Sequence, residues 1–318
     1  MKYTKKGARV QVDQAFIAAI EERISKARLD SYRGYFSCSD DAEVVGAYLW
    51  NKSLATAFYP LLQAIEVTLR NAIHHSATAH FSGNREWFLM RRFPQKNNKA
   101  KWFYKKKNGD SINPRPDPDT VVSRLTFGYW VELLTAGYDD PVDNNLLWPT
   151  LIPAVFPNAN GVMATRRSLH KRFKFIKDFR NRVGHHEPLW KIKDTINGAG
   201  NIERSGPTNP DESIARLNEY IGLMLDALRW MSDERYQFVR GTGLVEQVEQ
   251  LCSIEALHSF QRKGPASGKF NKLYKKMSER GALKGAISGV YSLKTSKKGQ
   301  FLGEDVILDV RHIRPPKF

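Results

Sequence analysis

The sequence predicts a mainly α-helical protein: a helical bundle followed by a small basic C-terminal α/β extension. Apolar residues recur at three- and four-residue steps over long segments, which is typical of amphipathic helices. Hydrophobic residues make up 41% of the 318-residue chain, which is enough for a folded core. Glycine, proline and asparagine gather in a few stretches between the periodic segments, where they indicate loops.

Five long helices are predicted, over residues 13–28, 40–80, 119–136, 164–187 and 211–240. The second has the densest apolar pattern. Asp40 and Asp41 are its candidate caps, and Pro60 predicts a kink or a break inside it. Gly137 lies just past the end of the third helix, where a glycine favours termination.

The helical part is expected to form one domain over residues 1–240, with a basic, aromatic insertion at 91–118. Residues 241–318 are expected to form a separate basic module. This module opens with one more amphipathic helix, GLVEQVEQLCSIEALHSF. It ends with the apolar run VILDV at 306–310, which predicts a short strand.

The chain is strongly basic, with a net charge of +17 and a pI near 9.8. This surplus indicates an anionic partner, and nucleic acid is favoured over a membrane surface.

Cys38 and Cys252 lie far apart without ligand spacing, which suits a reducing cytoplasm. No apolar run reaches the roughly 20 residues needed to cross a bilayer. No apolar segment follows the basic N-terminus, as it would in a signal peptide. We therefore expect a soluble cytoplasmic protein with no membrane partner.

The segment FRNRVGHHEPLW at 179–190 brings an arginine, an asparagine and two histidines to a helix end. Asn181 and His185 are four residues apart and share a helix face. An imidazole, with an ordinary pKa of about 6.5, can take a proton from a ribose 2′-OH or give one to the leaving 5′-oxygen. A guanidinium can bind the phosphate and stabilise transition-state charge. The pattern thus suits RNA cleavage without a metal.

The alternative is structural: these side chains complement the helix dipole, and Pro188-Leu189-Trp190 is a packing anchor.

The same segment resembles known families. Arg180, Asn181 and His185 match the R-x4-H signature of HEPN ribonucleases. The longer string FIKDFRNRVGHHEPLW is similar to the Abi-like family (AbiD/AbiF type) of bacterial phage-defence proteins. Two further landmarks of that family occur in the same order, YLWNKSLATAFYPLLQAIEVTLRNAI at 48–73 and LTFGYWVELL at 125–134. The resemblance spans residues 15–235.

The resemblance implies an HEPN-like helical bundle and a metal-independent endoribonuclease without a cofactor. It also implies a homodimer in which the R-x4-H helices of two protomers face each other across a composite site. Arg180, Asn181 and His185 carry over as the catalytic set, and Arg182, His186 and Glu187 as supporting residues. Some members bind a structured small non-coding RNA, so capture of such an RNA without cleavage is the alternative function. A DNA-binding regulator ranks lower, because no helix-turn-helix pattern is found.

A second R-x4-H pattern occurs within LRNAIHH at 69–75. It could mark a second active site, but the dense apolar stripe of this helix favours buried polar contacts for Arg70 and Asn71. These contacts would support the motif helix. Metal binding by the two His-His pairs is rejected, because adjacent helical histidines diverge by about 100° and no metal-ligand spacing accompanies them. We therefore expect no metal site.

Three basic segments are candidate RNA-binding surfaces. The insertion interleaves cations with aromatic rings, as single-stranded RNA requires, unless its aromatics return to the core. The helix before the motif should expose its cations, an arrangement that would also suit a membrane surface. The C-terminal patch fits an RNA-binding extension, or a docking or dimerisation module. The candidates are Arg91, Arg92, Lys96, Lys99, Lys101, Trp102, Tyr104, Lys105, Lys106 and Lys107 in the insertion; Arg166, Arg167, Lys171, Arg172, Lys174 and Lys177 in the helix; and Lys272, Lys275 and Lys276 in the C-terminal patch.

Overall fold

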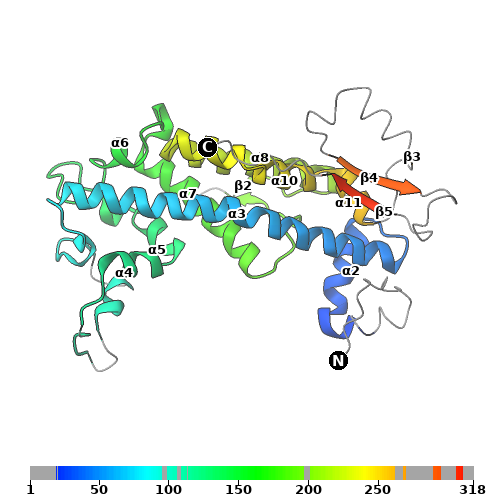
Figure 1. Ribbon diagram of the computed structural model, residues 1–318, viewed down its shortest axis with the longest axis horizontal. Helices are drawn as coiled ribbons and strands as arrows, with labels where there is room; N and C mark the ends of the chain where they lie inside the picture. Colours follow the sequence, from blue (N-terminus) through cyan, green and yellow to red (C-terminus); the bar gives the residue numbers. More distant parts are fainter. Residues whose placement is uncertain are drawn as a thin grey trace. The chain divides into compact units, whose positions relative to one another are not determined.

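The computed structural model is mainly helical, as predicted (Figure 1). It describes residues 19, 21–94, 99–105, 109–112, 114–196 and 201–261, and the backbone of strands at 268–269, 289–294 and 306–310. Two compact units are distinguished. Unit 1 comprises residues 1–57, 188–218 and 246–315, and unit 2 comprises 58–187, 219–245 and 316–318. The expected division into 1–240 and 241–318 stays a prediction.

Unit 1 contains α2 (Lys26–Tyr35), the first part of α3 (Asp41–His80), the start of α8 (Pro210–Met231), most of α10 (Leu244–Leu251), and α11 (Ile254–Phe260). Its two-stranded sheet pairs β1 (Thr195–Ile196) with β2 (Ile202–Arg204) in antiparallel fashion. In its three-stranded sheet, β4 (Gly289–Lys294) lies between parallel β3 (Gly268–Lys269) and antiparallel β5 (Val306–Val310). β5 confirms the strand predicted for VILDV.

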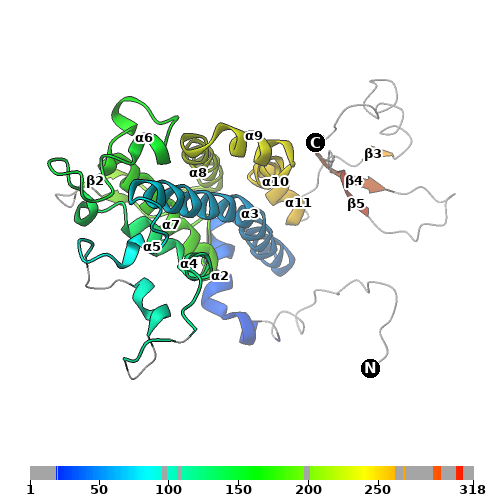
Figure 2. The same ribbon diagram turned by 60° about the vertical axis from the view of Figure 1, so that its left-hand side comes forward.

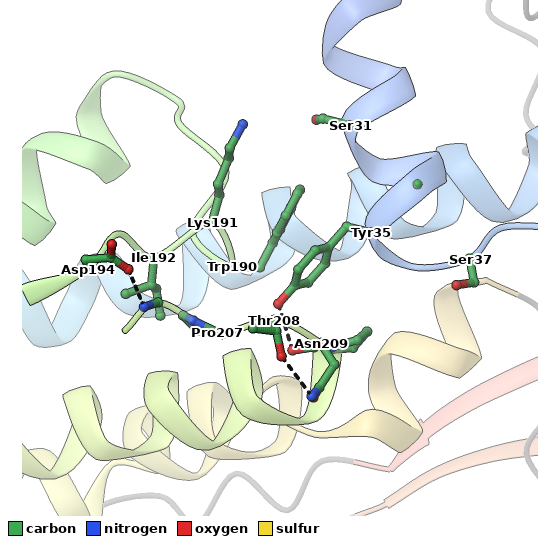
Figure 3. Close-up of a pocket in the computed structure, with 13 residues that line it drawn as sticks. Ser31, Tyr35, Ser37, Trp190, Lys191, Ile192, Asp194, Pro207, Thr208 and Asn209 are labelled. Atoms are coloured by element: carbon green, nitrogen blue, oxygen red, sulfur yellow. Dashed lines mark hydrogen bonds between the residues drawn. The ribbon is translucent and has the colours of Figure 1, made fainter. Parts of the chain in front are cut away.

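An aromatic cluster around Trp190 forms part of the core of unit 1. The Trp190 ring stacks on Tyr35 with centroids 4.3 Å apart, and it contacts Tyr32 and Phe36 at 5.3 and 5.1 Å. Figure 3 shows Tyr35 beside Trp190, and the Tyr35 hydroxyl donates to the Asn209 carbonyl at 2.7 Å. The sequence left open that Pro188-Leu189-Trp190 is a packing anchor, and the burial of Trp190 among these rings is what that alternative predicts.

Unit 2 contains the rest of α3 and α8, together with α4 (Pro118–Arg124), α5 (Phe127–Glu132), α6 (Ile152–Val155), α7 (Arg166–Gly184) and α9 (Asp233–Gly241). Its 3₁₀ helices are η1 (Trp87–Leu89), η2 (Lys99–Tyr104), η3 (Ala136–Tyr138) and η4 (Gly161–Met163). Both views place α7 beside the second part of α3 (Figure 1, Figure 2). Leu169, Phe173 and Ile176 are buried, which confirms the predicted apolar side of α7.

Several predicted helices are divided. At two of the breaks a serine side chain caps the start of a new helix, although the apolar pattern continues across the break. The segment 211–240 becomes α8 and α9, and the Ser232 hydroxyl caps α9 by accepting the Arg235 N–H. The helix predicted after residue 240 likewise becomes α10 and α11, with Ser253 as the cap of α11. The segment 119–136 becomes α4, α5 and the start of η3. By contrast, α3 continues unbroken through Pro60.

The N-terminal prediction is only partly within the described residues. Residues 21–24 are helical, and Ser25, with φ of 93°, separates them from α2. The predicted helix 13–28 therefore ends too late, and α2 itself was not predicted. Among the described helices, none is both long and apolar enough to cross a membrane.

Close backbone packing at Gly46 of α3 generates a stability prediction. A Cβ at Gly46 would lie 2.1 Å from the Phe260 carbonyl oxygen, whereas a Cβ at Gly34 of α2 would meet nothing within 4 Å. We expect Gly46→Ala to lower the free energy of unfolding by about 1–3 kcal/mol, because the backbones must separate. Gly34→Ala should be neutral or stabilising by up to about 1 kcal/mol, because alanine favours helix. Chemical denaturation compares the two, and equal stability would contradict the close packing of α3 at Phe260.

Candidate functional site

The packing of Phe179 orients the last turn of α7. This ring is 2% exposed and lies 4.8 Å from Phe58 on α3 and 5.7 Å from Tyr220 on α8, measured between centroids. Because consecutive helical residues are 100° apart, burying Phe179 turns the next side chain outward. Arg180 is accordingly exposed, and Asn181 is half-buried.

The C-terminal end of α7 is a Schellman motif. The His186 N–H donates to the Val183 carbonyl at 3.1 Å, and the Glu187 N–H donates to the Arg182 carbonyl at 3.0 Å. His186 has φ of 58°, the left-handed conformation that this motif requires and that glycine usually supplies. Gly184 is the last helical residue, three residues before the predicted end of this helix at residue 187. The motif leaves both adjacent histidines exposed.

Arg180 is paired with Glu66 of α3, a residue that sequence reasoning missed. Arg180 Nε lies 3.9 Å from Glu66 Oε2, with the side chains 44% and 24% exposed. Burial raises the pKa of the Glu66 carboxyl, partly offset by the charges of Arg180 and Arg70 and by the Phe127 N–H. The single Glu66 carboxylate thus interacts with the guanidinium groups of both Arg180 and Arg70. Together the three side chains keep a net positive charge, which could attract a phosphate. The signal that could have found Glu66 is its i,i+4 spacing to Arg70.

Arg70 and Asn71 do not make the buried contacts expected of them. Arg70 is half-exposed and Asn71 is exposed, and Arg70 Nε donates to Asn71 Oδ1 at 3.2 Å. The prediction was wrong because the apolar stripe buries the other side of α3, through residues such as Leu69 and Ile73. The α3 residue that interacts with Arg180 is instead Glu66, which also interacts with Arg70.

The two histidines of the second pattern have different environments. His74 is 4% exposed, and its Nδ1 accepts the Trp87 Nε1–H at 3.2 Å. Burial lowers the pKa of His74, partly opposed by Asp119, whose Oδ1 is 3.6 Å from Nε2. His75, which occupies the R-x4-H position, is exposed. His74 is therefore the structural histidine of α3, and His75 offers a matched control for His185.

The cations of α7 fall into two groups. Arg166 Nε donates to Asp139 Oδ2 at 2.8 Å, and its side chain is 18% exposed. Arg172 Nη1 donates to the Leu223 carbonyl at 2.9 Å, the guanidinium lies 4.5 Å from the Trp230 ring centroid, and the side chain is 15% exposed. The expectation that both line an exposed face was wrong, because both contact neighbouring segments of unit 2. Arg167, Lys171 and Lys174 are exposed as expected, and Lys177 is half-buried.

The candidate RNA-binding residues of the insertion also differ in their exposure. Trp102 is 69% exposed, whereas Tyr104 is 8% exposed and returns to the core. Arg91, Arg92, Lys99 and Lys105 are exposed, and Lys101 is half-buried. Lys96, Lys106, Lys107, Lys272, Lys275 and Lys276 lie outside the described residues.

A cavity of about 790 Å³ in unit 1 does not include the predicted catalytic residues. Tyr35, Trp190, Lys191, Thr208 and Asn209 are among the residues that line it (Figure 3). Within the part of the chain that the structure describes, no group of three or more His, Cys, Asp or Glu side chains is arranged to hold a metal ion. The exposed end of α7 therefore remains the candidate site.

The left-handed conformation of His186 generates a second prediction. We compare His186→Gly with His186→Ala, since both remove the imidazole and differ only in backbone freedom. The glycine variant should have a free energy of unfolding higher by roughly 0.5–1 kcal/mol, because only alanine is strained at positive φ. Thermal or chemical denaturation measures the difference. A more stable alanine variant would show that α7 does not end in this motif.

Comparison with known proteins identifies a family for this chain. A family model described as Abi-like protein matches residues 15–191, more than half of the 318-residue chain. The matched range includes α3, α7 and the R-x4-H segment. No match was found among curated proteins or among solved structures. On this evidence, the chain belongs to the Abi-like protein family.

Proposed function

We propose that this protein is a cytoplasmic endoribonuclease that cleaves RNA at the C-terminal end of α7 and works as a homodimer. Membership of the Abi-like family implies a role in abortive-infection phage defence. The observation that supports the nuclease is the joint exposure of Arg180 and His185 at the end of a firmly packed helix, with Arg180 paired to Glu66.

The proposed chemistry needs only side chains of this site. Arg180 binds the scissile phosphate and stabilises the charge that develops on it. The ribose 2′-oxygen attacks the phosphorus as its proton passes to an imidazole, and the bond to the 5′-oxygen breaks as that oxygen receives a proton. The products carry a 2′,3′-cyclic phosphate and a 5′-hydroxyl. Asn181 orients the phosphate or the imidazole of His185, and a homodimer supplies a second His185, so that one imidazole accepts the proton and the other donates one.

Capture of a structured RNA without cleavage is the second candidate function. The exposed cations Arg167, Lys171 and Lys174 on α7 favour it, because a phosphate backbone could bind there without any use of His185. The two functions differ in what His185 does. A nuclease needs it for turnover, whereas a binding protein does not.

His185→Ala tests the proposal, with His75→Ala as the matched control. We expect His185→Ala to lower the rate of cleavage of bacterial total RNA by about 100-fold or more, the usual loss when a general acid or base is removed. His75→Ala should cleave at the parental rate. The parent's products should carry 5′-hydroxyl ends and form equally well in a chelator. Equal cleavage by both variants, or 5′-phosphate ends, would refute the assignment.

A further inference from the structure

We propose that the insertion in unit 2 binds one nucleotide of single-stranded RNA, with the phosphate in a cation-lined pocket and the base stacked on Trp102. The proposal rests on RNA being the ligand of the protein, but not on cleavage. The pocket has a volume of about 580 Å³. Among the described residues that line it, Lys101, Lys105 and Arg115 are cationic and none is acidic.

The walls of this pocket are fixed by backbone pairing. Gly109, two residues before Ser111, has φ of 89°, a left-handed backbone conformation that favours glycine. Lys105 and Ser111 form an antiparallel bridge, and the Ile112 N–H donates to the Tyr104 carbonyl at 3.0 Å. Backbone pairing therefore holds Lys105 opposite Ser111, while Lys101 lies in η2.

Arg115 is held in one orientation at this pocket. Its Nε and Nη2 donate to the two carboxylate oxygens of Glu86, at 2.9 and 2.6 Å. Its guanidinium also lies 5.0 Å from the Tyr104 ring centroid. Glu86 offsets the Arg115 charge, so exposed Lys105 is the main source of positive charge that would attract a phosphate, and Lys101 lines the same pocket.

Trp102 supplies an aromatic face beside the pocket. Its side chain is 69% exposed, unlike Trp87 and Trp130, which are fully buried. In a 3₁₀ helix, residues three apart lie on the same side, so Lys101 and Tyr104 line the pocket together while Trp102 lies on the adjacent side. An exposed indole next to lysines is the arrangement that stacks an unpaired base while cations hold its phosphate. A duplex presents no free base face, so the site should prefer single strands.

Tryptophan fluorescence tests the proposal in the His185→Ala protein, which should not cut the probe. We expect a single-stranded RNA 12-mer to quench the emission, and the matching duplex to quench it less. Trp102→Ala should abolish the quenching and weaken binding by about 5-fold or more, the usual range for loss of one stacked base. Trp102→Phe should restore most of the affinity. The control Tyr59→Ala removes another exposed aromatic side chain, one that is 61% exposed, and should leave binding unchanged.

A double variant, Lys101→Ala with Lys105→Ala, tests the phosphate contact. It should reduce the slope of log affinity against log salt by about 0.7, the value for one phosphate contact on a single strand. Equal affinity of Trp102→Ala and Tyr59→Ala would overturn the proposal, as would quenching by anionic vesicles but not by RNA. Quenching as expected without any cleavage by the parent would refute the nuclease alone. Cleavage by the parent without these binding effects would refute the pocket alone.

Discussion

The burial of Phe179 between Phe58 and Tyr220 is the contact on which the candidate site depends. At a helix end, the residues that do not pack against neighbouring helices are exposed. The burial of the Phe179 ring therefore sets the directions of the Arg180 and Asn181 side chains. With Phe179 buried, Arg180 emerges from the helix and can pair with Glu66. The Schellman motif then stops α7 one turn later and exposes His185. The apolar contact of Phe179 thus leaves Arg180 and His185 exposed, and these are the polar groups that would act on a phosphate.

The arginines of unit 2 show why composition alone cannot assign a basic protein's binding surface. Arg166 and Arg172 satisfy carbonyl or carboxylate groups inside the unit and stabilise its packing. Arg180 lies on the same helix, is 44% exposed and shares a carboxylate with Arg70. A net charge of +17 counts all of them equally. Only the environment of each guanidinium separates a structural role from a role in phosphate binding.

Sequence periodicity predicted the long helices well, because α3 and α7 bury continuous apolar stripes. It did not predict the breaks at Ser232 and Ser253, since a capping hydroxyl is a local hydrogen-bonding event that leaves the apolar period unchanged. The motif segment was singled out by its residue types and spacing, and its catalytic role stays a prediction. Glu66 was missed because its partner Arg180 is distant in sequence, and pairing across two helices depends on their packing.

In the proposed function, His185 takes part in the chemistry and does not merely hold RNA. The most direct measurement takes one RNA that the parent cleaves and determines both its dissociation constant and its single-turnover cleavage rate, for the parent and for His185→Ala. For His185→Ala we expect a rate lower by about 100-fold or more with a dissociation constant changed by only a few-fold. An unchanged rate, or a loss of affinity that accounts for the whole loss of rate, would contradict it.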